Sequence, residues 1–588
     1  MTRWTSAAAV KAISAAAFVG FASQAVAADV TWDRLLNADK DPNNWIMYHK
    51  DFTGWHFSGL DQINTSNVSN LRLAWQHTPG QQQRGIQSFP LAVDGVVYYT
   101  NTSGSVWALN GATGAPLWNY KAKIDQERAE STFYHPYNRG LAIGHGNVYI
   151  ATTDGRMIAL DKTDGSVVWD NEIMSVAKGA KGFTGAPLIV KDKVLIGANG
   201  GEFSSCCGPI FAVDAMSGEV IWQFDTIGGD QRSRDSWGNE SWKVGGGGGW
   251  MTGSYDAKTD TVWWGTANPA PLWDYIGADW QEEGARPGLN LYSSSVVVLD
   301  ADTGELSAYF QELPHDSWDF DSATGEFLLM EKGGKRFMVH PNKGGIIFVY
   351  DPDSIGGGNE MAVHNAYMVG ETYNFIKGVS RDGRLVGRHE LAEGKHLDQC
   401  PAIDGALSWN TGAFNPNLGL HYVVTQEFCF DIEVVRVDPR PDDYSGQAYF
   451  GASWTTKAPK QKVDGTPVNA AYGTLQARDP LSGKMKWRVE FKYPVLASLL
   501  ATKGNLVFVP GADGMFMAFD ARNGRLLWQH NNGLGHTGGV ISYMVGGKQY
   551  IAVVTGWGSH VSGNYPGLFG EPFTSMPTNG GNLMVFSL

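Results

Sequence analysis

The feature of this sequence that most restricts its possible folds is a short segment that recurs along the chain. Its pattern is A-x-D-x-x-x-G-x-x-x-W, and the first copy has Asn110 in place of the aspartate. The near-complete copies are ALNGATGAPLW (108–118), ALDKTDGSVVW (159–169), AVDAMSGEVIW (212–222), ARDPLSGKMKW (477–487) and AFDARNGRLLW (518–528). A sixth segment, VLDADTGELSA (298–308), keeps the aspartate and glycine but lacks the tryptophan. Self-similarity of this kind indicates a fold built from repeated units.

Each copy predicts a tight turn between two β-strands. The aspartate begins the turn by binding its own backbone, and the glycine supplies a positive φ. The alanine leaves room for a neighbouring aromatic ring, and the next strand carries the tryptophan to a packing slot. Apolar segments such as GVVYYTN and GNVYIATT precede the turns, which gives about four strands per unit. We therefore predict an all-β fold, an eight-bladed β-propeller with functional loops inserted where the spacing lengthens.

Length alone would favour about four domains in a chain of 588 residues, but the repeat favours one propeller domain over residues 28–588. Residues 1–27 are expected to be a secretory signal peptide, with Arg3 and Lys11 near the start and Ala25-Val26-Ala27 before the cleavage point. The signal peptide predicts a periplasmic location. No membrane span is expected in the mature protein, because no other apolar run reaches about 18 residues.

The formal net charge of −14 becomes −16 when the two positive charges of residues 1–27 are removed. An acidic surface argues against nucleic acid as a partner. It allows electrostatic steering of a basic protein partner.

One short segment concentrates carboxylates. LPHDSWDFDSATG (313–325) holds Asp316, Asp319 and Asp321 beside Trp318 and Phe320. Carboxylates this close repel one another unless a cation or a proton lies among them. From these residues alone the segment is either an acidic surface loop or part of a charged site.

The repeat is similar to the tryptophan-docking motif of the quinoprotein alcohol dehydrogenases, the methanol dehydrogenase family. It also resembles the repeat of an outer-membrane assembly lipoprotein whose propeller is only a scaffold. The resemblance to the dehydrogenases begins in NWIMYHKDFTGWHFSGLDQINTSNVSNLRLAW (44–75) and ends in NGGNLMVFSL (579–588). Because a fold does not determine a function, two hypotheses stand: a quinone-dependent dehydrogenase, or a non-catalytic scaffold that binds partner proteins and takes up no quinone.

The dehydrogenase resemblance implies a catalytic base and a metal site. The segment HDSWDFD matches the catalytic segment, which makes Asp319 the base. GANGGEF (197–203) and GTANPAPLW (265–273) resemble the metal segments, which makes Glu202 and Asn268 ligands beside Asp319. Oxygen donors of this kind suit calcium or a lanthanide. Taken singly, Glu202 could be a surface residue and Asn268 a turn former.

Asp321 bears on the choice of metal. At its position the calcium-using branch of the family typically has a small uncharged residue, whereas the lanthanide-using branch has an aspartate. A further carboxylate suits a trivalent ion, so a lanthanide is favoured and calcium remains the alternative. The other interpretation of Asp321 is an ordinary aspartate in the polar turn DSATG.

The resemblance implies pyrroloquinoline quinone (PQQ) as the organic cofactor. Trp250 follows five glycines and matches the tryptophan on which the ring stacks. Lys343 stands where many relatives have an arginine, and a cation there would stabilise negative charge on the quinone oxygen. The other implied cofactor contacts are Gln87, Arg139, Thr184, Gly200, Gly201, Cys206, Cys207, Asn410 and Trp557.

The four cysteines divide into two kinds. Cys400 and Cys429 match a structural disulfide of the family. Cys206 and Cys207 are adjacent in sequence, whereas many relatives have adjacent cysteines where this chain has Phe133 and Tyr134. The Cys206-Cys207 pair is either a vicinal disulfide above the quinone or two buried thiols. No C-x-x-C-H haem motif occurs.

The implied reaction is oxidation of an alcohol, with Asp319 taking the hydroxyl proton and hydride passing to PQQ. A separate cytochrome c or similar acceptor then receives the electrons. Leu496 replaces a bulky tryptophan of the relatives, which predicts room for a large substrate. The motifs also resemble those of bacterial quinoproteins that oxidise the C3 hydroxyl of deoxynivalenol, so a bulky secondary alcohol is the leading expectation. Polyvinyl alcohol and simple primary alcohols are the alternatives.

Overall fold

The computed structural model describes residues 29–588 except 81–82, 126, 128–136, 175–181, 200–207, 244, 275–284, 390, 392–395, 435–450 and 560. The regular secondary structure of the described part is almost entirely β-strand, as the repeat predicts. Its α-helices are α1 (Trp32–Leu36), α3 (Gln231–Asp235) and α4 (Tyr565–Phe569), and its 3-10 helices are η1 (Ala38–Lys40), η2 (Val68–Asn70), η3 (Glu240–Lys243) and η4 (Val561–Asn564). No helix among the described residues is long and apolar enough to cross a bilayer.

Eight sheets of four or five strands contain most of the described strands. The first four consist of β3 (Leu91–Val93), β4 (Val96–Thr100), β5 (Val106–Asn110) and β6 (Pro116–Tyr120); of β7 (Ala142–Gly144), β8 (Asn147–Ala151), β9 (Arg156–Asp161) and β10 (Val167–Glu172); of β11 (Leu188–Val190), β12 (Lys193–Gly197), β13 (Ile210–Asp214) and β14 (Val220–Phe224); and of β15 (Ser254–Asp256), β16 (Thr261–Gly265), β17 (Ser295–Asp300), β18 (Leu306–Gln311) and β22 (Asn359–Glu360).

The other four large sheets consist of β19 (Leu328–Lys332), β20 (Lys335–Pro341), β21 (Ile346–Tyr350) and β23 (Val363–Met368); of β27 (Ala413–Asn415), β28 (Leu420–Glu427), β31 (Tyr472–Arg478) and β32 (Met485–Phe491); of β33 (Leu500–Thr502), β34 (Leu506–Pro510), β35 (Met515–Asp520), β36 (Leu526–Asn531) and β1 (Phe57–Ser58); and of β37 (Val540–Val545), β38 (Lys548–Val554), β39 (Leu583–Ser587) and β2 (Arg72–His77). Two smaller sheets join β24 (Gly378–Val379) to β25 (Leu385–Val386), and β26 (His396–Gln399) to β29 (Cys429–Val434) and β30 (Ala452–Lys457).

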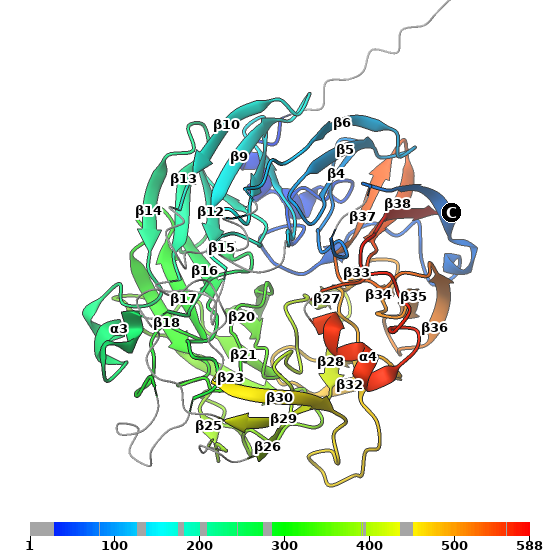
Figure 1. The fold of residues 1–588 in the computed structure, drawn as a ribbon. Helices are drawn as coiled ribbons and strands as arrows, with labels where there is room; N and C mark the ends of the chain where they lie inside the picture. Colours follow the sequence, from blue (N-terminus) through cyan, green and yellow to red (C-terminus); the bar gives the residue numbers. More distant parts are fainter. Residues whose placement is uncertain are drawn as a thin grey trace, which may run out of the picture.

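The large sheets follow one another around the molecule in chain order (Figure 1). The ring closes where β2, near the N-terminus, pairs antiparallel with the C-terminal strand β39. A sheet shared by strands from both ends of the chain closes the ring, and the radial repetition of sheets in a propeller leaves only short, protected edges.

The repeat acts at the contact between neighbouring sheets. The Trp118 indole donates its Nε1 proton to the carbonyl of Lys162 at 3.1 Å, in the next copy of the repeat. A Cβ atom added to Gly165 of that copy would lie 2.5 Å from the Trp118 ring, so only glycine leaves room for the indole. Trp75, Trp169, Trp222 and Trp487 make the same indole-to-carbonyl bond to the copy that follows each of them.

The copy at 477–487 receives a tyrosine in place of a tryptophan. Tyr367 of β23 donates its hydroxyl proton to the carbonyl of Pro480 at 3.0 Å. A Cβ on Gly483 would lie 2.4 Å from this ring. The slot predicted for tryptophan therefore also accepts a tyrosine.

Replacing Gly165 by alanine should destabilise the protein in two ways, through backbone strain and through a clash with the Trp118 ring. The residue has φ +74°, which costs a non-glycine residue about 1–2 kcal/mol, and the new methyl group would press on Trp118, where overpacking typically costs about 1–3 kcal/mol. Gly146→Ala is the matched control, because Gly146 has φ +78° but nothing within 4 Å of its added Cβ. We expect the urea midpoint to fall clearly further for Gly165→Ala; equal losses would contradict a role for the indole contact.

Candidate active site

Several predicted site residues occupy one structural position. Gln87, Thr184 and Trp250 each lie four residues before the first residue of an inner strand, β3, β11 and β15, and Arg139 and Asn410 lie three residues before β7 and β27. The backbone links neighbouring segments, since Phe89 donates its N–H to the carbonyl of Arg139 and Arg139 donates its own to the carbonyl of Thr184, both at 3.0 Å. Residues far apart in the sequence are thereby brought together.

The Arg139 guanidinium lies between two indole rings. Its Cζ atom is 4.7 Å from the ring centre of Trp250 and 4.9 Å from that of Trp409. Burial lowers the pKa of Arg139 to about 10, which still leaves it charged at neutral pH. No described carboxylate pairs with it, and its buried Nε atom has no hydrogen-bond partner. A buried cation without an anion is costly, so the site fits a ligand that brings one.

Other buried polar atoms in the same segments lack partners. They include Gln87 Oε1, Asn410 Oδ1 and the hydroxyl of Tyr48. Tyr48, Trp250 and Trp409 belong to one apolar cluster with Phe89 and Met251. Flat aromatic walls, a buried arginine and unpartnered polar atoms together fit a planar molecule that carries carboxylates, which is the chemistry of PQQ.

The aspartate-rich segment is folded by its first carboxylate. Asp316 accepts hydrogen bonds from the backbone N–H groups of Trp318 and Phe320, both at 2.9 Å, and from the Ser294 hydroxyl at 2.7 Å. Burial raises the pKa of Asp316. Asp319 lies between the two anchored amides and has φ +65°, a strained conformation for an aspartate. Asp316 is therefore structural, and it holds Asp319 in position.

Lys343 is the positive charge among these carboxylates. Its Nζ atom lies 3.1 Å from Asp319 Oδ2 and 3.8 Å from Asp321 Oδ2. Asp321 is fixed further, because its Oδ2 accepts a bond from Trp250 Nε1 at 2.9 Å and its Oδ1 one from the Asn268 backbone N–H at 2.7 Å. The predicted base, the predicted stacking tryptophan and two predicted metal ligands thus meet in one buried network.

The donor atoms here fit a hard cation. Asp319, Asp321 and Asn268 are 8%, 3% and 1% exposed, and their side chains offer oxygen atoms in the absence of any sulfur or imidazole. Among the described residues no three His, Cys, Asp or Glu side chains gather into a metal-binding group. The remaining expected ligand, Glu202, lies outside the described residues, as do Gly200, Gly201, Cys206 and Cys207.

Two predicted positions belong to a different apolar cluster. Trp557 is 1% exposed and Leu496 is 2% exposed, and both pack in the cluster that contains Tyr565 of α4 and Phe573. The Trp557 ring lies 5.3 Å from that of Tyr565 and 5.0 Å from that of Phe573. Leu496 therefore lies among apolar side chains.

The sequence patterns missed Asp404, which lies close to Lys343. A Cβ on the next residue, Gly405, would lie 2.4 Å from Lys343 Cγ, so this loop packs directly on the lysine. Burial raises the pKa of Asp404 to about 6, and Asn564 of η4 donates to its Oδ2 at 2.6 Å. No repeat or motif in the sequence marks Asp404. The close approach of Gly405 to Lys343, which reveals it, is visible only in the structure.

The disulfide predicted between Cys400 and Cys429 is confirmed. Gln399, next to Cys400, accepts a bond from Trp273 Nε1 at 2.9 Å and donates to the carbonyl of Trp318 at 3.0 Å. The disulfide therefore joins β29 to the residue after β26, a strand whose Gln399 contacts the aspartate-rich segment 313–325.

Comparison with known proteins places the chain among similar sequences and structures. It matches the family described as "PQQ: Glucose/ethanol/alcohol dehydrogenase, beta-propeller domain" over residues 45–373 and 391–551. It is 34% identical over 579 residues to a quinohemoprotein alcohol dehydrogenase of Comamonas testosteroni, covering 94% of this chain and 79% of that one. It is 32% identical over 603 residues to a lanthanide-dependent methanol dehydrogenase of Methylacidiphilum fumariolicum, covering 95% and 94%. The solved structure of a europium-containing methanol dehydrogenase aligns with a TM-score of 0.83 and 29% identity, covering 95% of this chain and 100% of that one.

Proposed function

This chain belongs to the family of PQQ-dependent alcohol dehydrogenases, and on that premise we propose that it oxidises a bulky secondary alcohol, such as the C3 hydroxyl of deoxynivalenol, to the ketone. We propose further that the reaction takes place in the periplasm after removal of residues 1–27, and that a separate cytochrome c receives the electrons. Family membership makes the chain an enzyme, so the scaffold hypothesis is set aside.

The observation that carries the proposal is the position of Asp319. It is held in a strained backbone conformation, 3.1 Å from Lys343, in a network that includes Trp250. Strain of this kind is typical of residues whose position serves a function. When bound, PQQ supplies the two-electron acceptor that the protein side chains lack.

The roles of the residues follow from this geometry. Asp319 is the general base that takes the proton of the substrate hydroxyl. Lys343 orients the Asp319 carboxylate and presents a positive charge to the cofactor. Arg139 and Trp250 hold the cofactor by charge and stacking, with Gln87, Thr184 and Asn410 as further polar contacts, and Asn268, Asp321 and Glu202 hold a calcium or lanthanide ion together with Asp319.

The architecture proposed with this function is a single domain over residues 28–588. Each of the eight large sheets would form one blade of an eight-bladed propeller. The support for this proposal is the bond from four of the five repeat tryptophans to the next copy of the repeat and the closure of the ring by β2 and β39.

The substrate class is tested by comparing catalytic efficiencies in a dye-linked assay of the PQQ-loaded enzyme. We expect kcat/KM for deoxynivalenol to exceed that for methanol and ethanol by at least about tenfold, since apolar contacts are worth roughly 10–200-fold in discrimination. Mass spectrometry should find a product lighter by two hydrogen atoms. Methanol or polyvinyl alcohol as the best substrate would overturn the choice of substrate and leave the alcohol dehydrogenase activity in place.

A further inference from the structure

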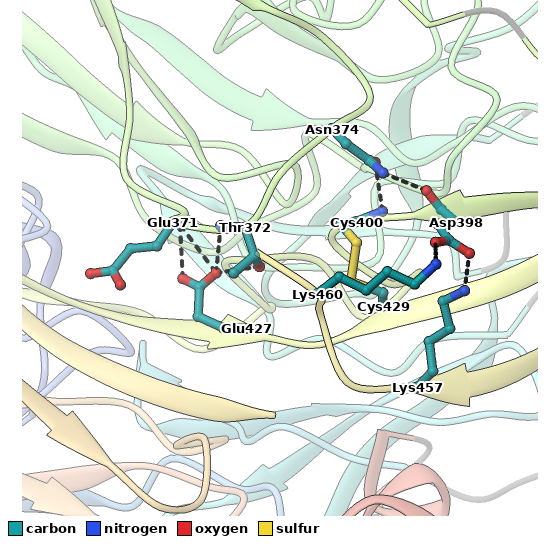
Figure 2. Close-up of a disulfide and its surroundings, with 9 residues drawn as sticks. All are labelled: Glu371, Thr372, Asn374, Asp398, Cys400, Glu427, Cys429, Lys457 and Lys460. Carbon is teal, nitrogen blue, oxygen red and sulfur yellow. Dashed lines mark hydrogen bonds and ion pairs between the residues drawn. A yellow bond between two sulfur atoms is a disulfide. The ribbon is translucent and has the colours of Figure 1, made fainter. Parts of the chain in front are cut away.

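A groove lined with lysines opens beside the disulfide. It has a volume of about 790 Å³, and its charged lining residues are Lys377, Lys457, Lys460, Lys462, Asp398 and Asp464. We call it the lysine groove. Figure 2 shows Lys457 and Lys460 reaching toward Asp398 next to the bond between Cys400 and Cys429. Four lysines against two aspartates make this place positive in a protein whose net charge is −14.

The carboxylates in and around the groove do not neutralise its lysines one for one. Lys457 and Lys460 both pair with Asp398, the latter at 2.8 Å. Burial and the nearby Lys460 charge lower the pKa of Lys457. Lys462 pairs with Glu371, which Arg488 also binds. Asp398 and Glu371 are therefore each shared by two cations, so an added anion would gain attraction that these two carboxylates leave unused.

The inner wall of the groove touches the catalytic segment. Between Asn374 and Ile376, which line the groove, the buried ring of Phe375 packs against Trp318 at 5.2 Å and Phe320 at 4.8 Å. These two aromatic residues flank Asp319. Gln399, between the lining residues Asp398 and Cys400, donates a hydrogen bond to the carbonyl of Trp318 at 3.0 Å. Phe375, packed on Trp318 and Phe320, thus connects the groove to the segment that carries Asp319.

We infer that the lysine groove is where the electron-accepting protein docks, and that this protein presents a carboxylate-rich face. The inference rests on the proposed function. Two successive encounters, each reducing one oxidised acceptor by one electron, would remove the two electrons gained from the alcohol and release two protons to solvent. Lys460 is 78% exposed, so its charge is available to a large partner. The acidic remainder of the surface would repel such a partner, which makes the groove selective for orientation.

The inference reverses the expectation drawn from net charge alone. An acidic protein should steer basic partners, but a local positive patch beside the redox site decides which partner docks productively. Ionic strength should weaken the association, because exposed charges are screened over about 8–10 Å at physiological salt.

The test uses the PQQ-loaded enzyme and two exposed groove lysines. The variant Lys377→Glu/Lys460→Glu is compared with Lys484→Glu/Lys486→Glu, which makes the same charge change at exposed lysines of a separate cavity on the outer strands. Turnover is measured with a small redox dye and with a c-type cytochrome of strongly negative net charge as the probe. We expect the groove variant to lose at least about tenfold in kcat/KM for the cytochrome, to keep its dye-linked turnover, and to respond less to salt. The control variant should keep both activities.

Each other outcome is informative. Equal losses of cytochrome reduction in both variants would show a net-charge effect and overturn the inference. Parallel losses in the dye and cytochrome assays would show damage to the catalytic segment, and would overturn it as well. Thermal stabilisation by citrate that the groove variant alone loses, with cytochrome reduction unchanged, would assign the groove to a small carboxylate instead. Absence of dye-linked alcohol oxidation in the unmodified enzyme would refute the proposed function itself.

Discussion

Asp319→Asn should lower alcohol turnover by about 10²–10⁴-fold, the range that general-base catalysis contributes, while cofactor binding is retained. Asparagine has nearly the shape of aspartate but cannot take up the hydroxyl proton. The hydrogen bonds that hold the segment are made by Asp316, which accepts them from the backbone N–H groups of Trp318 and Phe320 and takes no part in the reaction. The substitution at Asp319 leaves these bonds in place. Turnover is measured in the dye-linked assay, and PQQ binding by absorbance titration of the apo-protein.

The control for this experiment is Asp382→Asn, which changes an exposed turn aspartate. It should leave turnover unchanged. Turnover of Asp319→Asn within about tenfold of the unmodified enzyme would remove Asp319 from the role of base. Loss of PQQ binding in the same variant would make Asp319 a binding residue, and the turnover change would then say nothing about proton transfer.

The fold was predictable because its determinants are local. In the repeat, the aspartate and glycine specify a turn whatever surrounds them, and the structure shows both at work: Thr163 donates its N–H to Asp161 Oδ1 at 2.7 Å, and Gly165 has φ +74°. The sequence pattern also predicted that the tryptophan would fill a packing slot. What the pattern could not give is the partner, since Trp118 bonds a carbonyl 44 residues further along the chain.

The site was predictable only as a set of residue types. The sequence presents Asp316, Asp319 and Asp321 as three similar carboxylates, yet the structure gives them different tasks. Asp316 anchors backbone amides, Asp319 faces Lys343, and Asp321 bonds Trp250 and Asn268. These differences depend on which way the backbone turns at Asp319, and that turn is set by contacts from distant segments.

Residues without a motif were missed for the same reason. Tyr48 and Asp404 acquire their surroundings only when the inner ends of the sheets converge. Tyr48 Cε1 lies 3.6 Å from a Cβ placed on Gly325, a neighbour of the catalytic segment that sequence distance does not reveal.

The clustered carboxylates of the segment 313–325 need a positive charge among them, and this requirement bears on the choice of metal. Lys343 already supplies one positive charge between Asp319 and Asp321. Two carboxylates facing one ammonium still leave a net negative site, and the amide oxygen of Asn268 adds a further hard donor. An ion of higher charge gains more from such a site than a divalent ion does, so Asp321 should matter more for a lanthanide than for calcium.

Asp321→Ala should therefore separate the two metals. We expect lanthanum-supported turnover to fall by about 10–100-fold, the range seen when a residue supporting a metal site is removed, and calcium-supported turnover to fall less. The unmodified apo-protein, loaded with PQQ and each metal in parallel, should turn over faster with lanthanum. Dye-linked turnover against metal concentration gives both the affinity and the limiting rate.

Asp321→Asn removes the charge and keeps one of the two hydrogen bonds, because Trp250 Nε1 and the Asn268 backbone N–H donate to different oxygens of Asp321 and an amide has a single oxygen. If the carboxylate charge selects the metal, Asn and Ala variants should lose lanthanum dependence alike. If Asp321 acts by fixing Trp250 and Asn268, the Asn variant, which keeps one of the two bonds, should retain more activity than the Ala variant with both metals alike. If calcium supports turnover of the unmodified enzyme as well as lanthanum does, Asp321 has a purely structural role. Asp321 would then fix the position of the stacking tryptophan, and the other ligands would determine which ion binds.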